Sequence, residues 1–230
     1  MAASLIYRHR LLYETAMLAL YGRHYGARYR AIADLIPAGS TVVDLCCGPA
    51  VLFHRYLRQK HVQYTGLDVS RVFVRDLIAR GGRGVVWNMQ DPAALPEADY
   101  VVMQASLYHA LPTPEPLLDR MLKAALKSVI LAEPIRNLSQ SKHRWIAELG
   151  RRLSDPGEGV SANRFTERSL DALFAPYAAR VTGRFLIPGG REKVFVLRGA
   201  SVSATVEAGL TVSSANDSRS IAAHHGASGA

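Results

Sequence analysis

The chain has 230 residues, of which 49% are hydrophobic and 20% are charged. This composition is typical of a soluble globular protein, and the length suits one α/β domain with additions. The formal net charge of +9 favours anionic partners, although it can also serve solubility alone. The only two cysteines, Cys46 and Cys47, are neighbours, which excludes a disulfide framework. Apolar runs near the N-terminus are too short to span a bilayer, and Glu14 interrupts any signal-peptide core, so we expect a cytoplasmic protein.

Residues 1–36 are basic and rich in tyrosine, and their apolar spacing predicts two helices, the second beginning after Gly26. We expect them to form a helical cap. Its basic residues include Arg8, Arg10, Arg23 and Arg28. Together with the large apolar side chains, they are compatible with peripheral contact with a membrane, whereas packing on the rest of the domain is the alternative.

Strands and helices then alternate. The predicted strands are 41–46, 62–68, 84–89, 98–104 and 128–134, and the predicted helices between them are 52–60, 71–80 and 115–126. Further along, 180–187 and 191–199 are two strands around a turn. This order predicts an α/β fold with a Rossmann-like, seven-stranded, mostly parallel sheet and helices on both faces.

The alternation breaks after Glu133. Residues 135–165 are an insertion with a predicted helix, since Trp145, Leu149 and Leu153 are four residues apart. A helix capped by Thr166 follows. Residues 200–230 are rich in Ala, Ser and Gly, and we expect a disordered tail because they offer little apolar surface to bury.

The carboxyl ends of parallel strands meet at one edge of a sheet, where ligands bind. The first strand ends in "DLCCGPA", which contains Asp44 and Gly48, and the second ends in Asp68, 24 residues after Asp44. An acid at the end of the second strand can accept hydrogen bonds from ribose hydroxyls, and Gly48 lets a ligand approach the backbone. A dinucleotide is disfavoured because no Gly-x-Gly-x-x-Gly turn is present. Asp44 instead suits a ligand with an ammonium group.

At these residues the sequence resembles the class I S-adenosylmethionine-dependent methyltransferases over about residues 40–198. "VVDLCCGPA" is similar to the family's first motif, and "YTGLDVS" is similar to its ribose motif. Asp91 before "AALP", the stretch "ADYVVMQASLYHAL", the late helix and the final antiparallel pair are similar to the family's later elements. The resemblance implies a methyltransferase domain over 37–199, an antiparallel last strand and S-adenosylmethionine as cofactor.

The resemblance also implies roles for single residues. Asp44 would act near the methionine ammonium, Asp68 would hold the ribose, Asp91 would meet the adenine, and Gln104 would line the pocket. The cofactor-binding set that we predict is completed by the neighbouring positions Cys46, Gly48, Val69 and Gln90. Cys46 and Ala50 stand where the family has glycine, which puts the affinity of the loop in question.

Three residues are candidates for catalysis. His109 and Tyr108 follow the fourth strand, where a substrate should lie, and His109 could take a proton from an acceptor hydroxyl, although packing roles are the alternative. Glu133 ends the fifth strand and could act as a base, position an amine or make structural hydrogen bonds. We expect no metal site, because two adjacent cysteines without partners at metal-ligand spacing hold a metal poorly.

The function expected from these residues is methyl transfer from S-adenosylmethionine to a small-molecule acceptor or biosynthetic intermediate. A non-catalytic, methyltransferase-like binding or regulatory subunit is the alternative. A nucleic-acid methyltransferase is less favoured, because no Asn-Pro-Pro-aromatic motif follows the fourth strand and no basic patch interleaved with aromatic residues is present. Neither the acceptor atom nor the oligomeric state follows from the sequence.

Overall fold

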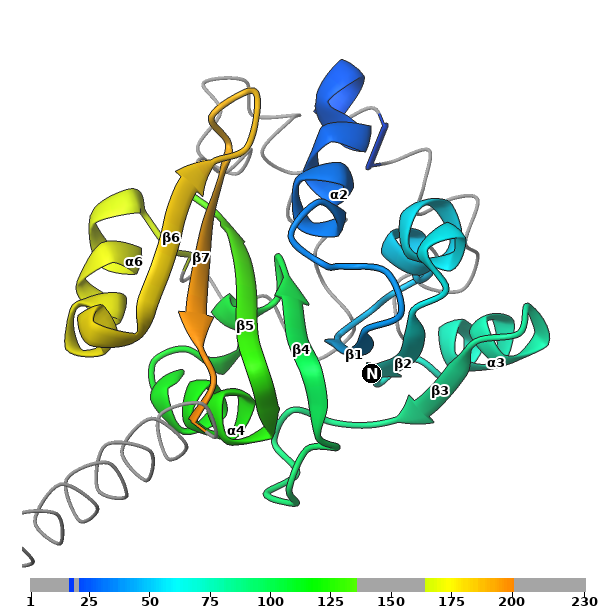
Figure 1. Cartoon of the computed structure of the whole chain (residues 1–230). Helices are drawn as coiled ribbons and strands as arrows, with labels where there is room; N and C mark the ends of the chain where they lie inside the picture. Colours follow the sequence, from blue (N-terminus) through cyan, green and yellow to red (C-terminus); the bar gives the residue numbers. More distant parts are fainter. Residues whose placement is uncertain (1–16, 19–20, 136–163, 201–230) are drawn as a thin grey trace, which may run out of the picture.

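One seven-stranded sheet organises the protein, and the computed structural model describes residues 17–18, 21–135 and 164–200. The strands are β1 Thr41–Leu45, β2 Gln63–Asp68, β3 Arg83–Val86, β4 Ala98–Gln104, β5 Ala125–Pro134, β6 Val181–Leu186 and β7 Glu192–Arg198. Their spatial order is β3-β2-β1-β4-β5-β7-β6, from β3 at one edge to β6 at the other (Figure 1). β1 to β5 pair in parallel, whereas β7 is antiparallel to β5 and β6. The predicted sheet and its antiparallel last strand are confirmed.

Helices cover both faces of the sheet, as predicted. α4 (Glu115–Ala124) and α6 (Glu167–Phe174) bury Leu118 and Leu170 in one apolar cluster with β4 and β5. α2 (Tyr25–Ala33) and the helical stretch after β1 bury Ile32 and Leu57 in a second cluster. The central strands are apolar on both sides because each side meets helices.

α6 begins as the sequence indicates. The Thr166 hydroxyl accepts a hydrogen bond from the Ser169 amide at 3.1 Å, which caps the helix. Lys193 of β7 then lies within 3.0 Å of Glu167 and 2.7 Å of Asp171, and these ion pairs hold α6 against the sheet.

Several predicted boundaries differ from the structure. The stretch expected as a helix over 52–60 contains a π-helix, η3 (Phe53–Leu57), followed by a 3-10 helix, η4 (Arg58–Lys60). The third strand ends at Val86 rather than at residue 89, and α2 starts at Tyr25 rather than after Gly26. The helix expected over 115–126 ends at Ala124 because Ala125 pairs with Ala98 of β4. In that last case pairing in the sheet outweighs helix propensity.

Of the two alternatives for Arg28, membrane contact or packing on the domain, the structure supports packing. Tyr25, Tyr29 and Ile32 of α2 are buried in the core, and Arg28 is itself buried and ion-paired with Glu192 of β7, with Nη2 and Oε1 2.9 Å apart. The described end of the predicted cap therefore packs on the sheet.

The other predictions of this kind concern residues that the structure does not describe. Arg8 and Arg10, almost all of the first predicted helix, the insertion over 136–163 and the tail over 201–230 lie outside the described residues. In the described part of the chain, no helix combines the length and apolarity that crossing a membrane requires.

Candidate functional site at the carboxyl edge of the sheet

The topological switch point of the sheet lies between β1 and β4. From β1 the chain continues through β2 and β3 on one side and then crosses to β4 and β5 on the other, and ligands of such sheets bind where the direction reverses. The loops that follow β1 and β4 contain three non-glycine residues with positive φ, namely Cys46 at 55°, Ala50 at 50° and Ala105 at 52°. Backbone strain of this kind concentrates at functional sites.

Asp68 joins the ends of β1 and β2. Its Oδ2 accepts a hydrogen bond from the Gly48 amide at 2.7 Å, and its Oδ1 accepts one from the Ser70 amide at 2.8 Å. Gly48 has a φ of 54°, and a Cβ added there would have no heavy atom within 4 Å. The backbone of Gly48 is therefore bordered by open space next to a buried carboxylate, which fits the close approach of a ribose-bearing ligand.

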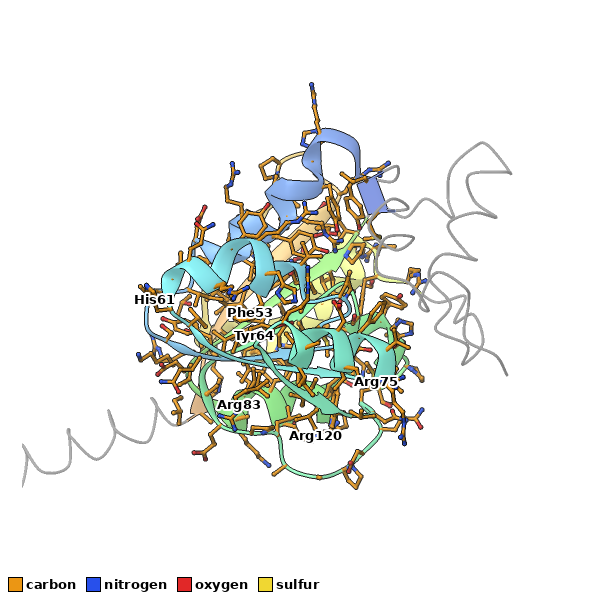
Figure 2. All side chains as sticks on the ribbon, turned by 90° about the vertical axis from the view of Figure 1, so that its right-hand side faces the viewer. Phe53, His61, Tyr64, Arg75, Arg83 and Arg120 are labelled. Carbon is orange, nitrogen blue, oxygen red and sulfur yellow. The ribbon has the colours of Figure 1, made fainter. Side chains whose placement is uncertain are left out.

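Asp44 is buried in β1 on the face that carries α2. Its Oδ2 accepts a hydrogen bond from the Tyr64 hydroxyl at 2.7 Å, and the Tyr64 ring stacks on Phe53 at 4.6 Å between centroids (Figure 2). Burial raises the pKa of Asp44 to about 7, although the bond from Tyr64 opposes the shift. A carboxylate held in this state is stabilised by a bound cation.

Neither cysteine is activated. Burial raises the pKa of both thiols, and the charges of Asp68 and Asp44 raise them further. Cys47 packs on Gly66, where an added Cβ would lie 2.7 Å from its Sγ, so a larger residue at this position would force Cys47 and its neighbours to shift. Across the described residues, no three His, Cys, Asp or Glu side chains form a group suited to a metal ion.

The loop after β3 carries Gln90 and Asp91, and both are exposed. The Gln90 amide donates to Asn88 Oδ1 at 3.0 Å, and Asp91 Oδ1 accepts from the Ala93 amide at 2.9 Å. Arg120 of α4, which the sequence did not suggest, donates to the backbone carbonyls of Met89 at 2.6 Å and of Asp91. Arg120 therefore holds the loop that carries Gln90 and Asp91.

Residues at and after the end of β4 lie on the other side of the switch point from Asp44 and Asp68. The Gln104 side chain is half-buried and donates to the Arg28 carbonyl at 3.2 Å, which ties β4 to α2. Tyr108 is buried in the core, with the Arg164 guanidinium 3.4 Å from its ring centroid and the His109 ring at 4.0 Å. These contacts favour a packing role for Tyr108. The catalytic roles of Tyr108 and His109 stay predictions.

Glu133 is buried at the end of β5 with 0% exposure. Its Oε1 accepts hydrogen bonds from the amides of Ser106 and Leu107, each at 2.7 Å, whereas Oε2 has no hydrogen-bond partner in the described part of the chain. The pKa of Glu133 is raised to about 8, mainly by burial and also by the charge of Glu192. The hydrogen bonds from the Leu107 and Ser106 amides lower the pKa, and Arg164 lowers it weakly.

Apart from Tyr108 and His109, the predicted site residues fall into three sets. Asp44, Cys46, Gly48 and Asp68 lie together around the end of β1, and Gln104 and Glu133 lie at the ends of β4 and β5. Val69, Gln90 and Asp91 lie on the exposed side of the same edge, after β2 and β3. The ion pair of Arg28 and Glu192 was missed, because no local pattern couples residues 164 positions apart.

Several solved structures with a similar fold are methyltransferases. A chain of the complex between the Haloferax volcanii Trm112 methyltransferase activator and a methyltransferase is 16% identical and has a TM-score of 0.60, with 80% of this chain and 92% of that chain covered. Magnesium protoporphyrin IX methyltransferase from Synechocystis, solved with bound S-adenosylhomocysteine, is 14% identical with a TM-score of 0.55, covering 76% and 85%. N-methyltransferase NodS from Bradyrhizobium japonicum, also solved with S-adenosylhomocysteine, is 12% identical with a TM-score of 0.55, covering 77% and 88%. At these identities the likeness concerns the fold alone.

Sequence comparison gives the family. Among curated proteins none matches significantly. A sequence model described as methionine biosynthesis protein MetW matches residues 26–154, more than half of the chain, and spans every strand from β1 to β5. The chain therefore belongs to the MetW family and has the fold of the class I S-adenosylmethionine-dependent methyltransferases.

Proposed function

We propose that the protein binds S-adenosylmethionine at the carboxyl edge of its sheet and transfers the methyl group to a small-molecule acceptor. The observation that carries the proposal is the bond between the Gly48 amide and the buried Asp68 carboxylate, beside open space at the switch point. In the bound state, Asp68 would hold the ribose, Asp44 would face the ammonium group, and the loop with Gln90 and Asp91 would meet the adenine.

The cofactor supplies an already activated methyl group, so the protein has to align the acceptor and exclude water rather than provide strong chemistry. Gln104, His109 and Glu133 are the residues at the ends of β4 and β5 that are available to contact the acceptor. The family description supports an acceptor or role within methionine biosynthesis. A host strain that lacks the gene should then grow normally only when methionine is supplied.

The first test is calorimetric titration with S-adenosylhomocysteine. The wild-type protein should bind it, and Asp68→Ala should weaken binding by about 1–3 kcal/mol because the ribose bonds are lost. Glu97→Gln, which removes an exposed carboxylate away from the site, should leave the affinity unchanged. An unchanged affinity in Asp68→Ala would move the site elsewhere.

A second candidate is a binding or regulatory subunit without catalysis. It is favoured by Cys46 and Ala50, whose side chains occupy positive-φ positions in the loop that would hold the cofactor. Complete absence of S-adenosylhomocysteine binding, with a protein that melts cooperatively, would support this candidate and reject the enzyme.

A further inference from the structure

The interior of the site is acidic although the protein as a whole is basic. Within the described residues, the buried acids are Asp44, Asp68, Glu133 and Glu192, and the buried bases are Arg28 and Lys193. Arg28 pairs with Glu192, and Lys193 pairs with two acids of α6. Asp44, Asp68 and Glu133 are therefore left without a paired cation in this part of the chain.

Two of these three carboxylates belong to the proposed cofactor site. Asp68 has both oxygens bonded to backbone amides, and Asp44 is bonded to Tyr64. Both also lie close enough to Cys46 to raise the pKa of its thiol. A sulfonium and an ammonium group on one ligand would offset these two charges.

Glu133 is the third carboxylate, and it lies across the switch point at the end of β5. Oε1 is fully engaged by the Ser106 and Leu107 amides, so the glutamate also positions the backbone after β4. Oε2 is buried and has no partner among the residues described. Leaving a buried acceptor unsatisfied is unfavourable, and a donor from a ligand would remove that cost.

The charged groups around Glu133 show what kind of donor is missing. Glu192 repels its negative charge, and Arg164 attracts it only weakly while stacking on Tyr108. Burial is the largest influence, and it favours the neutral acid until a cation arrives. A neutral hydroxyl would satisfy Oε2 as a hydrogen-bond donor but would not offset the charge. A ligand carboxylate would be repelled.

We propose that the acceptor is a primary or secondary amine whose nitrogen binds Oε2 of Glu133. This inference rests on the proposed methyl transfer. The amine binds as an ammonium ion beside the ionised carboxylate, and it gives one proton to Oε2 only when the methyl donor is in place, which leaves a neutral nitrogen with a free lone pair. That lone pair forms the bond to the transferred methyl carbon, while the electrons of the broken carbon–sulfur bond stay on sulfur. Glu133 is thus both the recognition group and the base.

The test uses n-butylamine, n-butanol and butyrate as probes of equal length. Thermal melting of the full chain is measured with each probe, both with and without saturating S-adenosylhomocysteine. We expect butylamine to raise the melting temperature and the other two probes to have no effect. Equal stabilisation by butanol or butyrate would overturn the choice of an amine.

Two variants test whether Glu133 is responsible for the rise in melting temperature with butylamine. Glu133→Gln keeps a carbonyl oxygen for the Ser106 and Leu107 amides, so it should melt and bind S-adenosylhomocysteine like the wild type but lose the response to butylamine. Glu97→Gln removes an exposed carboxylate and should keep the response. A response that survives in Glu133→Gln would contradict the inference.

The design separates this inference from the proposed function. Loss of S-adenosylhomocysteine binding alone counts against methyl transfer, whereas a butylamine response that depends on Glu133 still supports the amine site. If Glu133→Gln does not fold, the carboxyl carbon of Glu133 can be followed by 13C NMR in the wild type. Butylamine should move that signal towards the ionised form, and butanol should not; a signal that does not move would reject the inference.

Discussion

Asp44 is buried, although its proposed role beside an ammonium group requires a negative charge. Burial raises its pKa to about 7, against an ordinary value of 3.8. The folded state therefore keeps a proton between about pH 4 and pH 7 that the unfolded state has lost. Raising the pH from about 4 to about 7 therefore favours the unfolded chain, and the free energy of unfolding falls over this range.

Replacing Asp44 with Asn should remove this penalty. The amide oxygen can still accept the bond from Tyr64, and nothing ionises. We expect the stability of Asp44→Asn relative to the wild type to rise by about 2–3 kcal/mol between pH 5 and pH 8. Urea denaturation at the two pH values measures it. The same variant should bind S-adenosylhomocysteine more weakly, and a gain in stability that is equal at both pH values would contradict the buried-acid explanation.

Substitutions of Cys46 test whether the backbone conformation of the same loop is strained. Its φ of 55° lies in the left-handed region, which a β-branched residue adopts with difficulty. Cys46→Val should lose about 1–2 kcal/mol of stability, whereas Cys46→Gly should be tolerated or slightly stabilising. Thermal melting of both variants compares them. If the two variants melt alike, the loop is not constrained by this residue.

At the scale of elements, the buried ion pair of Arg28 and Glu192 joins α2 to the first residue of β7. Both side chains are almost fully buried, at 3% and 1% exposure, so neither charge can turn to water. The Arg28 carbonyl also accepts the bond from Gln104, which connects α2 to β4. The position of α2 over the carboxyl edge therefore depends on a contact between sequence-distant residues.

Breaking this pair on one side should be costly. Arg28→Met leaves Glu192 buried and unpaired, and we expect a loss of about 3–5 kcal/mol in the free energy of unfolding. The double variant Arg28→Met with Glu192→Leu should recover most of that loss, because no charge is left uncompensated. Urea denaturation of the single and double variants measures the coupling. A double variant as unstable as the single one would mean that Arg28 acts mainly through its other contacts.

Elements were also the scale at which sequence patterns were least accurate. Thr166 was correctly predicted as a helix cap because Ser169 lies within the same helical turn. The end of α4 was placed two residues too late, because the register of β5 against β4 decides it. The length of β3 was overestimated because Trp87 is apolar and buried but lies beyond the last pair with β2.

For the whole molecule, the net charge of +9 contrasts with the acidic interior of the site. S-adenosylmethionine carries a net positive charge, whereas S-adenosylhomocysteine is neutral overall. The positive surface charge repels a cationic ligand at long range, and salt weakens this repulsion. The buried carboxylates attract the ligand only at short range, where salt has little effect.

Added salt should therefore speed the association of S-adenosylmethionine by roughly 2–5-fold and leave S-adenosylhomocysteine unchanged. Stopped-flow binding at low and physiological ionic strength tests this. Slower association of S-adenosylmethionine in salt would mean that the local acidic field, rather than the surface, governs its approach.

The sequence by itself determined the class of fold and the cofactor half of the candidate site. Strand–helix alternation is a local periodicity. Asp44 and Asp68 stand at or next to the end of a strand, and Gly48 lies in the loop after the first strand, so their shared edge follows from the parallel order alone. Only the tertiary structure decided the other half. Arg28 meets Glu192 from 164 positions away, Arg120 reaches the Asp91 carbonyl across 29, and Glu133 holds the Ser106 amide across 27. Such contacts depend on how helices pack and how strands align in register, which no local pattern encodes. The sequence shows Glu133 only as one of several acids at strand ends. The tertiary structure shows that its carboxylate is buried and that Oε2 has no hydrogen-bond partner among the described residues.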